Sequence, residues 1–205
     1  MVKEPGIIIV ISAPSGAGKT SICREFFKTC PNVRYSVSFT TRPPRTGEKD
    51  GEDYSFISRE EFRKKIEAQD FVEWTEKFGY LYGTSKGAVQ ASLEKGSDIL
   101  LDIDTVGAKN IKNAFPEGVF VFILPPSMAE LKRRLLGRGS ETQADLKNRF
   151  DKAVDEIREA IWYDYAIVNE DINRAAEQFK AVYIAEKLKR SRIKYDIQRE
   201  FNLEE

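Results

Sequence analysis

A run of apolar residues near the amino terminus leads directly into a glycine-rich loop and a helical segment. The run extends from Ile7 to Ile11, and the string SAPSGAGKT follows it. Continuous apolar runs of this length are typical of strands buried on both faces of a sheet. The helical pattern continues to about Lys28, and Pro31 stops it because proline cannot extend a helix. The sequence therefore predicts a strand, a loop and a helix in that order.

The loop matches the phosphate-binding pattern G-x-x-x-x-G-K-[ST] at every fixed position except the first, where Ala13 stands in place of glycine. Gly16 and Gly18 allow successive backbone N–H groups to point at phosphate oxygens, and the helix that follows adds its positive end. Lys19 can then reach the β- and γ-phosphates of ATP, and the Thr20 hydroxyl can bind a Mg²⁺ ion that bridges them. The expected ATP-binding residues of the loop are Ala13, Pro14, Ser15, Gly16, Ala17, Gly18, Lys19 and Thr20.

Two features of this match remain open. A plain glycine-rich turn is the alternative to a nucleotide loop, although the surrounding strand and helix are the context that a nucleotide loop requires. Ala13 fits the loop geometry only if its position does not need a positive φ, which residues other than glycine rarely adopt.

Strands and helices alternate along much of the remaining chain. We expect further strands at 99–104, 119–124 and 165–169, and helices around 85–95, from 130 to about 161 with a charged interruption, and from 172 onward. Alternation of this kind predicts a parallel sheet. Asp102 and Asp104 end the first of these strands, at the edge where α/β proteins bind ligands. Either carboxylate could hold Mg²⁺ through water, or both could simply end the strand.

The segment from Val33 to Gly83 has a different pattern, with short strands, polar turns and one helix that a capping box at Ser58 begins. Within it, Arg42 and Arg45 surround a Pro-Pro pair. Two guanidinium groups held in this way suit one phosphate group. The alternative is a solvated loop with ordinary arginines.

Composition limits the possible partners. The chain has 205 residues, enough for one folded unit, with 33 Lys plus Arg and 33 Asp plus Glu. Because this balance leaves no chain-wide basic field, we expect no nucleic acid or membrane partner, and phosphate binding must be local. No segment resembles a signal peptide or a membrane span, so we expect a cytoplasmic protein. The chain contains no histidine, which removes the commonest general base.

The order of these motifs resembles the guanylate kinase family. The resemblance spans roughly Gly6 to Lys187 and is carried by the phosphate loop, SVSFTTRPPRTGEKDGEDYSF, FVEW, YGTS, ILLDID and LKRRLLGRGSET followed by IVN. It implies an α/β fold: a P-loop three-layer α/β/α core with a parallel sheet, an inserted mixed α+β GMP-binding region and a helical lid. The expected bounds are 1–35, 87–130 and 158–205 for the core, 36–86 for the GMP-binding region and 131–157 for the lid.

The resemblance also implies roles for individual side chains. Those that hold the GMP phosphate would be Arg42, Arg45, Tyr54 and Tyr82, and those that address guanine would be Ser38, Glu73, Thr84 and Asp104. In the lid, the residues that close over the ATP phosphates would be Arg134, Arg138 and Arg149, with Asn169 near the adenine. The expected catalytic residues are Lys19, Arg42, Arg138 and Arg149, and the expected metal-binding residues are Thr20 and Asp102.

Physical chemistry supports the role of Glu73. Guanine presents N1–H and N2–H donors side by side, which one carboxylate can accept together, whereas adenine would leave that carboxylate unpaired. Taken alone, however, Glu73 could be the exposed residue of an alternating strand, and this would be the favoured interpretation without the family match.

The implied activity is transfer of the γ-phosphoryl group from ATP to GMP, and to its deoxy form, with Mg²⁺ as cofactor and a place in purine nucleotide metabolism. Two alternatives stay open: a module of the same fold that binds a protein partner, and a kinase for another nucleoside monophosphate. The chain could be a monomer or a homodimer. Beyond Arg190, apolar residues at Ile193, Ile197 and Phe201 predict a last helix of undetermined role.

Overall fold

The main body of the protein is a parallel sheet of five strands. The computed structural model describes residues 6–77, 79–136 and 143–193. In spatial order the strands are β2 (Arg34–Tyr35), β7 (Ile99–Asp102), β1 (Ile8–Ser12), β8 (Val119–Leu124) and β9 (Tyr165–Val168). The register sets Ile11 of β1 beside Asp102 of β7, so the carboxyl ends of these strands meet at one edge. The predicted parallel sheet is confirmed.

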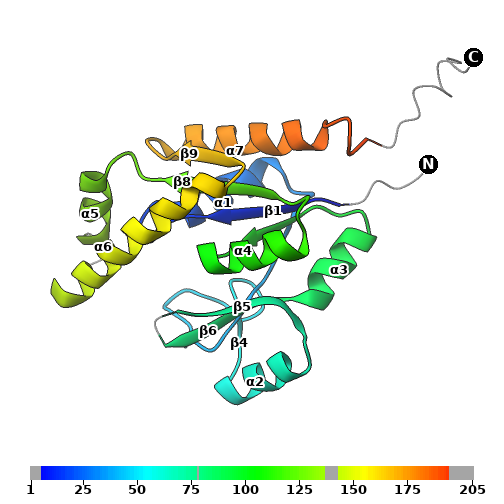
Figure 1. Cartoon of the computed structure of the whole chain (residues 1–205), viewed down its shortest axis with the longest axis horizontal. Helices are drawn as coiled ribbons and strands as arrows, with labels where there is room; N and C mark the ends of the chain where they lie inside the picture. The colour runs from blue at the N-terminus through cyan, green and yellow to red at the C-terminus, as the bar shows by residue number, and fades with distance from the viewer. Residues whose placement is uncertain (1–5, 78, 137–142, 194–205) are drawn as a thin grey trace, which may run out of the picture.

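Helices cover both faces of this sheet, which gives the three predicted layers (Figure 1). Because side chains alternate along a strand, Ile9 and Ile11 pack on one face with α1 (Lys19–Thr29) and α7 (Ile172–Lys187). Ile8 and Val10 pack on the other face with α3 (Lys86–Glu94) and α4 (Thr105–Ala114). The continuous apolar run therefore forms a strand buried on both sides.

A second, mixed sheet lies between α1 and α3 in the chain. Its strands are ordered β4 (Ser55–Phe56), β3 (Phe39–Thr40), β6 (Tyr80–Ser85) and β5 (Phe71–Lys77). Helix α2 (Arg59–Glu67) packs on it through fully buried Phe62, whose ring stacks on Phe71 with 4.5 Å between centroids. The predicted capping box is confirmed, because Ser58 accepts from the Glu61 amide and Glu61 accepts from the Ser58 amide.

Helices α5 (Met128–Leu136) and α6 (Gln143–Arg158) project from the end of the core away from the two termini (Figure 1). The 3₁₀ turn η1 (Glu159–Trp162) follows α6 and packs on the core, where Trp162 contacts Phe120. A small apolar cluster of Leu131, Leu135 and Ala153 holds the two helices together. A Cβ atom built on Gly16 would contact Leu131 and Leu135, so α5 packs directly on the phosphate loop.

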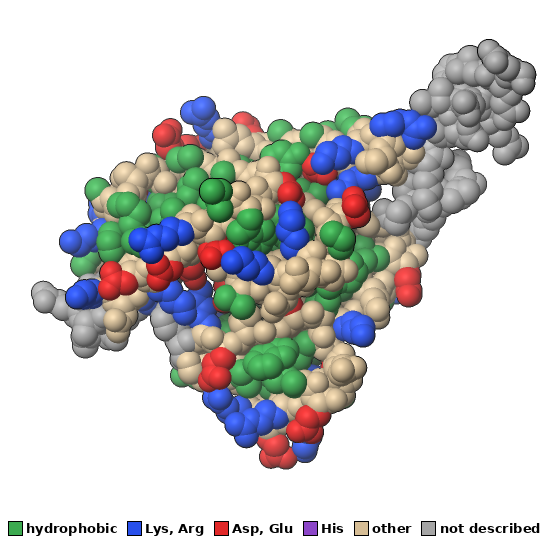
Figure 2. Space-filling model, viewed as in Figure 1, with side chains coloured by type: hydrophobic (Ala, Val, Ile, Leu, Met, Phe, Trp, Pro, Cys, Tyr) green, Lys and Arg blue, Asp and Glu red, His purple; other side chains and the backbone are tan. Residues whose placement is uncertain are grey.

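Acidic and basic side chains are interspersed on the face shown in Figure 2. Within the described residues, no helix has both the length and the apolar character needed to cross a bilayer. The predicted helix of the tail falls almost wholly outside the described residues, which end at Ile193.

Candidate active site

The glycine-rich loop connects β1 to α1 and has the geometry that its sequence predicts. Gly16 and Gly18 have φ of 91° and 95°, in the left-handed region that favours glycine. Gly18 is also the N-cap of α1, and a Cβ atom there would collide with the side-chain nitrogen of Asn169. Ala13 does not have a positive φ, so the alanine is compatible with the loop.

Lys19 and Asp102 face each other at the carboxyl edge of the sheet. The Lys19 ammonium group forms an ion pair with the Asp102 carboxylate and donates to the Ile103 carbonyl at 3.3 Å. Burial lowers the pKa of Lys19, but the neighbouring carboxylate more than offsets this and raises the pKa above its ordinary value. Lys19 is therefore a cation held in place beside the loop.

The Pro-Pro loop holds Arg42 in a fixed orientation. Its guanidinium group donates to Glu48 Oε1 and to the Pro43 carbonyl, both at 2.8 Å, and lies 5.4 Å from the centroid of the Tyr54 ring. The other oxygen of Glu48 accepts from the Arg45 backbone amide at 2.7 Å. The Arg42 side chain is thus buried and fixed by its neighbours, whereas Arg45 and the rest of the loop from Pro43 to Gly47 are exposed, as the alternative of a solvated loop would have them.

Glu73 is buried on β5, where only 6% of the residue is exposed, whereas its neighbour Trp74 is 43% exposed. The interpretation of Glu73 as the exposed residue of an alternating strand is therefore wrong. Glu73 Oε1 accepts a hydrogen bond of 2.5 Å from the Thr84 hydroxyl. Burial raises the pKa of Glu73 to about 7, and the Asp104 carboxylate contributes in the same direction.

Asp104 borders the same space and begins α4. Its Oδ1 atom accepts from the Val106 and Gly107 amides at 3.1 and 3.0 Å, and its Oδ2 atom lies 3.5 Å from the Thr75 hydroxyl. Asp104 is thus the N-cap of α4 as well as a residue of the cavity wall, and of the two aspartates only Asp102 ends the strand.

These groups open into one cavity of about 370 Å³ between the phosphate loop and the second sheet. The predicted site residues that line it are Ala13, Pro14, Ser15, Gly16, Gly18, Lys19, Thr20, Ser38, Arg42, Arg45, Tyr54, Glu73, Tyr82, Asp102, Asp104 and Arg149. Thr84 is fully buried and holds Glu73. Arg138 lies outside the described residues.

A family model described as guanylate kinase matches residues 6–186. The chain belongs to the guanylate kinase family. It is 50% identical over 202 residues to the guanylate kinase of Syntrophotalea carbinolica, covering 98% of this chain and 96% of that protein. It is 48% identical to the guanylate kinase of Clostridioides difficile, and the match covers all of both chains. A crystal structure of guanylate kinase from Anaplasma phagocytophilum superposes with a TM-score of 0.79 at 36% identity, covering 93% of this chain and 90% of that one.

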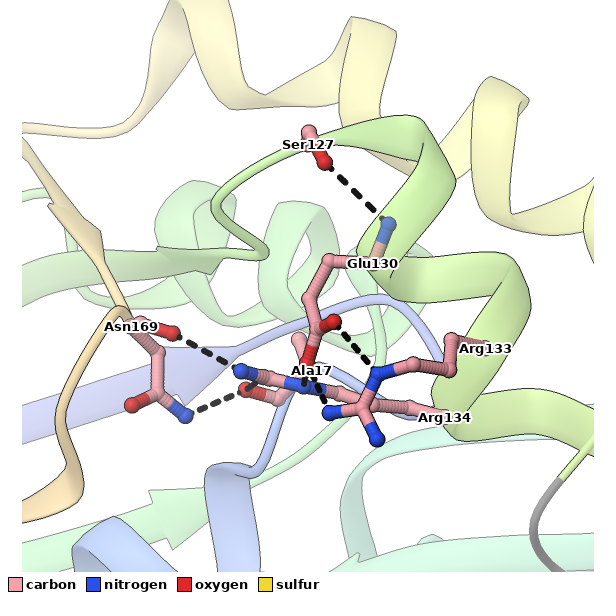
Figure 3. A network of polar contacts seen from close by, with 6 residues as sticks. All are labelled: Ala17, Ser127, Glu130, Arg133, Arg134 and Asn169. Atoms are coloured by element: carbon pink, nitrogen blue, oxygen red, sulfur yellow. Dashed lines mark hydrogen bonds and ion pairs between the residues drawn. The ribbon is translucent and has the colours of Figure 1, made fainter.

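In this member of the guanylate kinase family, a polar network ties α5 to the phosphate loop (Figure 3). The Asn169 side chain is buried and donates to the Ala17 carbonyl at 2.6 Å. The Arg134 guanidinium donates to the carbonyls of Asn169 at 3.2 Å and Ala17 at 3.4 Å, and to Glu130 at 2.7 Å. Arg134 and Asn169 also border a second, more open hollow beside Gly16 and Gly18.

Eight residues of the cavity wall were not among the predicted site residues: Ser21, Tyr35, Glu48, Asp53, Thr75, Lys77, Gly83 and Ile103. Glu48 has a local signal, because it lies three residues after Arg45 in a turn, within reach of that backbone amide. Thr75 and Lys77 alternate with exposed residues after Glu73, so the correct face of β5 would have indicated them.

Proposed function

We propose that the protein transfers the γ-phosphoryl group of ATP directly to the phosphate of GMP, giving ADP and GDP. This transfer is the known reaction of the guanylate kinase family. The observation that carries the proposal is that the phosphate loop, the buried carboxylate of Glu73 and the guanidinium group of Arg42 all border one cavity. A donor phosphate on the loop and a guanine base at Glu73 would bring both substrates into that cavity.

On the donor side, the loop amides and Lys19 would bind the β- and γ-phosphates of ATP. Lys19 pairs with Asp102, so phosphate oxygens would compete with that carboxylate for the ammonium group. The buried Oδ1 atom of Asn169 has no hydrogen-bond partner among the described residues, and an amino group of adenine would supply a donor.

The residues present fit a Mg²⁺ ion that arrives with ATP. Among the described residues, no group of three or more acidic, histidine or cysteine side chains could hold a metal alone. Thr20 and Asp102 do border the cavity with oxygen ligands, and Mg²⁺ is usually held by one or two protein oxygens together with substrate phosphates. When bound, the ion would neutralise charge on the transferred phosphoryl group.

On the acceptor side, Arg42, Arg45, Tyr54 and Tyr82 would hold the phosphate of GMP. The ionised Glu73 carboxylate would accept N1–H and N2–H of guanine, with Ser38, Thr84 and Asp104 completing the base site. Ring contacts support this arrangement. The ring centroids of Tyr54 and Tyr82 lie 6.1 Å apart, and the Arg42 guanidinium lies over the Tyr54 ring. An adenine base would leave a buried carboxylate unpaired, and the site would reject it for that reason.

The transfer itself needs no general base, because a phosphate monoester oxygen is already largely ionised near neutral pH. This fits a chain without histidine. Catalysis would consist of positioning the two phosphates in line and of stabilising charge through Lys19, Arg42, Arg138 and Arg149. Closure of the lid over them would exclude water.

The two alternatives differ from this proposal in specific groups. Gly16, Gly18, Lys19 and Thr20 are all present, which disfavours a binding module without catalysis. The buried Glu73 disfavours a kinase for a base that lacks adjacent N–H donors. We further propose that the deoxy form of GMP is accepted, and that the protein acts in purine nucleotide metabolism in the cytoplasm, where ATP and GMP are both available.

Release of ADP from ATP and Mg²⁺ tests the proposal, with GMP, deoxy-GMP, AMP, CMP and UMP supplied separately. We expect turnover with GMP and its deoxy form alone. A Lys19→Met preparation, purified in parallel, measures contaminating kinase activity. Turnover with another acceptor would overturn the assignment of the base site, and a lack of turnover with every acceptor would favour the binding module.

A further inference from the structure

The buried carboxylate of Glu73 lies against the first turn of α4. One of its oxygens, Oε1, is held by the Thr84 hydroxyl at 2.5 Å. The other oxygen, Oε2, faces Gly107: a Cβ atom built on Gly107 would lie 2.5 Å from Oε2 and 3.1 Å from Cδ of Glu73. Real Cβ atoms essentially never come so close to another heavy atom, so the carboxylate occupies the space that a side chain at position 107 would fill.

The backbone at Gly107 does not itself require glycine. Gly107 does not have a positive φ, and it lies within a regular helix, where alanine is a more stabilising residue. Glycine here therefore weakens the helix without serving a turn. The absence of a side chain at Gly107 leaves room for Glu73, because α4 packs directly against β5.

The backbone of Gly107 also holds a second carboxylate, that of Asp104. The Gly107 amide donates to Asp104 Oδ1 at 3.0 Å, so the turn that accommodates Glu73 also fixes Asp104. Both carboxylates border the cavity. The first turn of α4 thus sets the distance between two of the polar groups that a guanine base would meet.

We propose that Gly107 is a positioning residue for guanine selectivity, acting through the absence of a side chain that would push the Glu73 carboxylate toward the base. This rests on the proposed function. Glu73 is held on its other side by Thr84, so the displacement would be directed into the space of the base. Misplacement of a substrate-positioning group by about 1 Å can cost on the order of a hundredfold in rate.

The test is Gly107→Ala, with Gly87→Ala as its matched control. Both glycines lie in the first turn of an α-helix without a positive φ, but a Cβ atom at Gly87 would meet nothing within 4 Å. We expect Gly107→Ala to raise the KM for GMP about tenfold or more and to lower the preference for GMP over AMP, with the KM for ATP unchanged. Gly87→Ala should match the wild type.

A second variant keeps the test decisive if Gly107→Ala folds poorly. Shortening the carboxylate side chain by Glu73→Asp should restore space, so this change should cost less GMP affinity in the Gly107→Ala background than in the wild type. Such coupling would not arise if Gly107 only supported the helix.

Three outcomes separate the possibilities. If Gly107→Ala has the GMP parameters of Gly87→Ala, or if its KM values for ATP and GMP rise together, the role of Gly107 is refuted. If the wild-type protein itself does not phosphorylate GMP, the proposed function fails instead.

Discussion

The Lys19 ammonium group is held by the Asp102 carboxylate and by the Ile103 carbonyl. Asp102 is the last residue of β7 and Ile103 follows it, so the end of this strand fixes the position of the ammonium group beside the phosphate loop. Orientation of this kind lowers the reorganisation needed when phosphate charge develops during transfer. The neutral Lys19→Met side chain would keep the bulk of the aliphatic stem without the charge.

We expect Lys19→Met to lower turnover at least a hundredfold, since loss of one preorganised charge-stabilising group typically costs about 10² to 10³ in rate. Because Asp102 would lose its partner, the free energy of unfolding should also fall by about 1–3 kcal/mol. Steady-state kinetics and urea unfolding measure the two effects. Lys28→Met, at an exposed position on the same helix, is the control. Near-normal turnover of Lys19→Met would refute its role.

Glu73 gives base recognition a pH dependence with a definite sign. Its pKa is raised to about 7 by burial, and the ionised form is the one that accepts two N–H donors from guanine. Below pH 7 the carboxyl group becomes protonated and loses this ability. Guanosine is the suitable probe, because it has no phosphate group that titrates in the same range.

Inhibition by guanosine should therefore weaken as the pH falls from 8 to 6, by roughly tenfold, since one pH unit below the pKa leaves about a tenth of the groups ionised. Competitive inhibition constants measured against GMP test this. In Glu73→Gln the inhibition should be weak and independent of pH. Equal pH dependence in the wild type and the variant would show that another group titrates.

At the scale of elements, the phosphate loop depends on segments far from it in the chain. Gly18 is the N-cap of α1 and offers no side-chain hydrogen bond. The preceding residue is held from outside the loop, because the Ala17 carbonyl accepts from Asn169, which follows β9, and from Arg134 of α5 (Figure 3). These two hydrogen bonds fix the backbone of the loop, so its amides can remain directed toward a bound phosphate group.

Replacement of the anchor should loosen the loop. We expect Asn169→Ala to lower the free energy of unfolding by about 1–3 kcal/mol. The buried Ala17 carbonyl would lose the hydrogen bond of 2.6 Å from Asn169 and keep only the longer one, of 3.4 Å, from Arg134. The KM for ATP should rise, whereas the KM for GMP should not. Thermal unfolding and kinetics in both substrates check this, with the exposed Asn113→Ala on α4 as the control. An unchanged KM for ATP would mean that the loop keeps its geometry without this contact.

At the scale of the whole molecule, an ion pair joins the second sheet to α6, most of which lies within the predicted lid, 131–157. Lys77, the last residue of β5, lies 2.5 Å from Glu156 of α6, which is only 7% exposed. Lys152 lies in the same environment, and burial, followed by the nearby charge of Lys77, lowers its pKa. The pair therefore ties the second sheet to α6.

Removal of one partner should destabilise the protein more than removal of both. Lys77→Met would leave the buried Glu156 carboxylate less well compensated, and the free energy of unfolding should fall by roughly 3 kcal/mol. The double variant Lys77→Met and Glu156→Met should recover much of this loss. Urea unfolding of both variants measures the coupling, and Lys64→Met in the exposed pair with Glu60 should have little effect. Additive losses would contradict the coupling.

Local patterns in the sequence predicted the phosphate loop and most of the elements, although they missed α4 and placed the end of β7 two residues too late. The run Ile7 to Ile11 predicted a buried strand, the glycines predicted the phosphate loop, and the capping box at Ser58 predicted the start of a helix. Each depends on residues within about four positions of one another, where strand alternation, positive φ and helix capping act. The motif order was enough to indicate the family, and the comparisons confirmed it.

Tertiary structure alone decided which side chains meet. The local sequence alone favours an exposed strand position for Glu73. In the structure Glu73 is buried beside Gly107, because β5 packs against α4. The pairs Lys19 with Asp102 and Lys77 with Glu156 join residues far apart in the chain. Such contacts depend on the order of strands in the sheet and on the packing between elements. These are set by the burial of apolar surface over the whole chain, which no local pattern records.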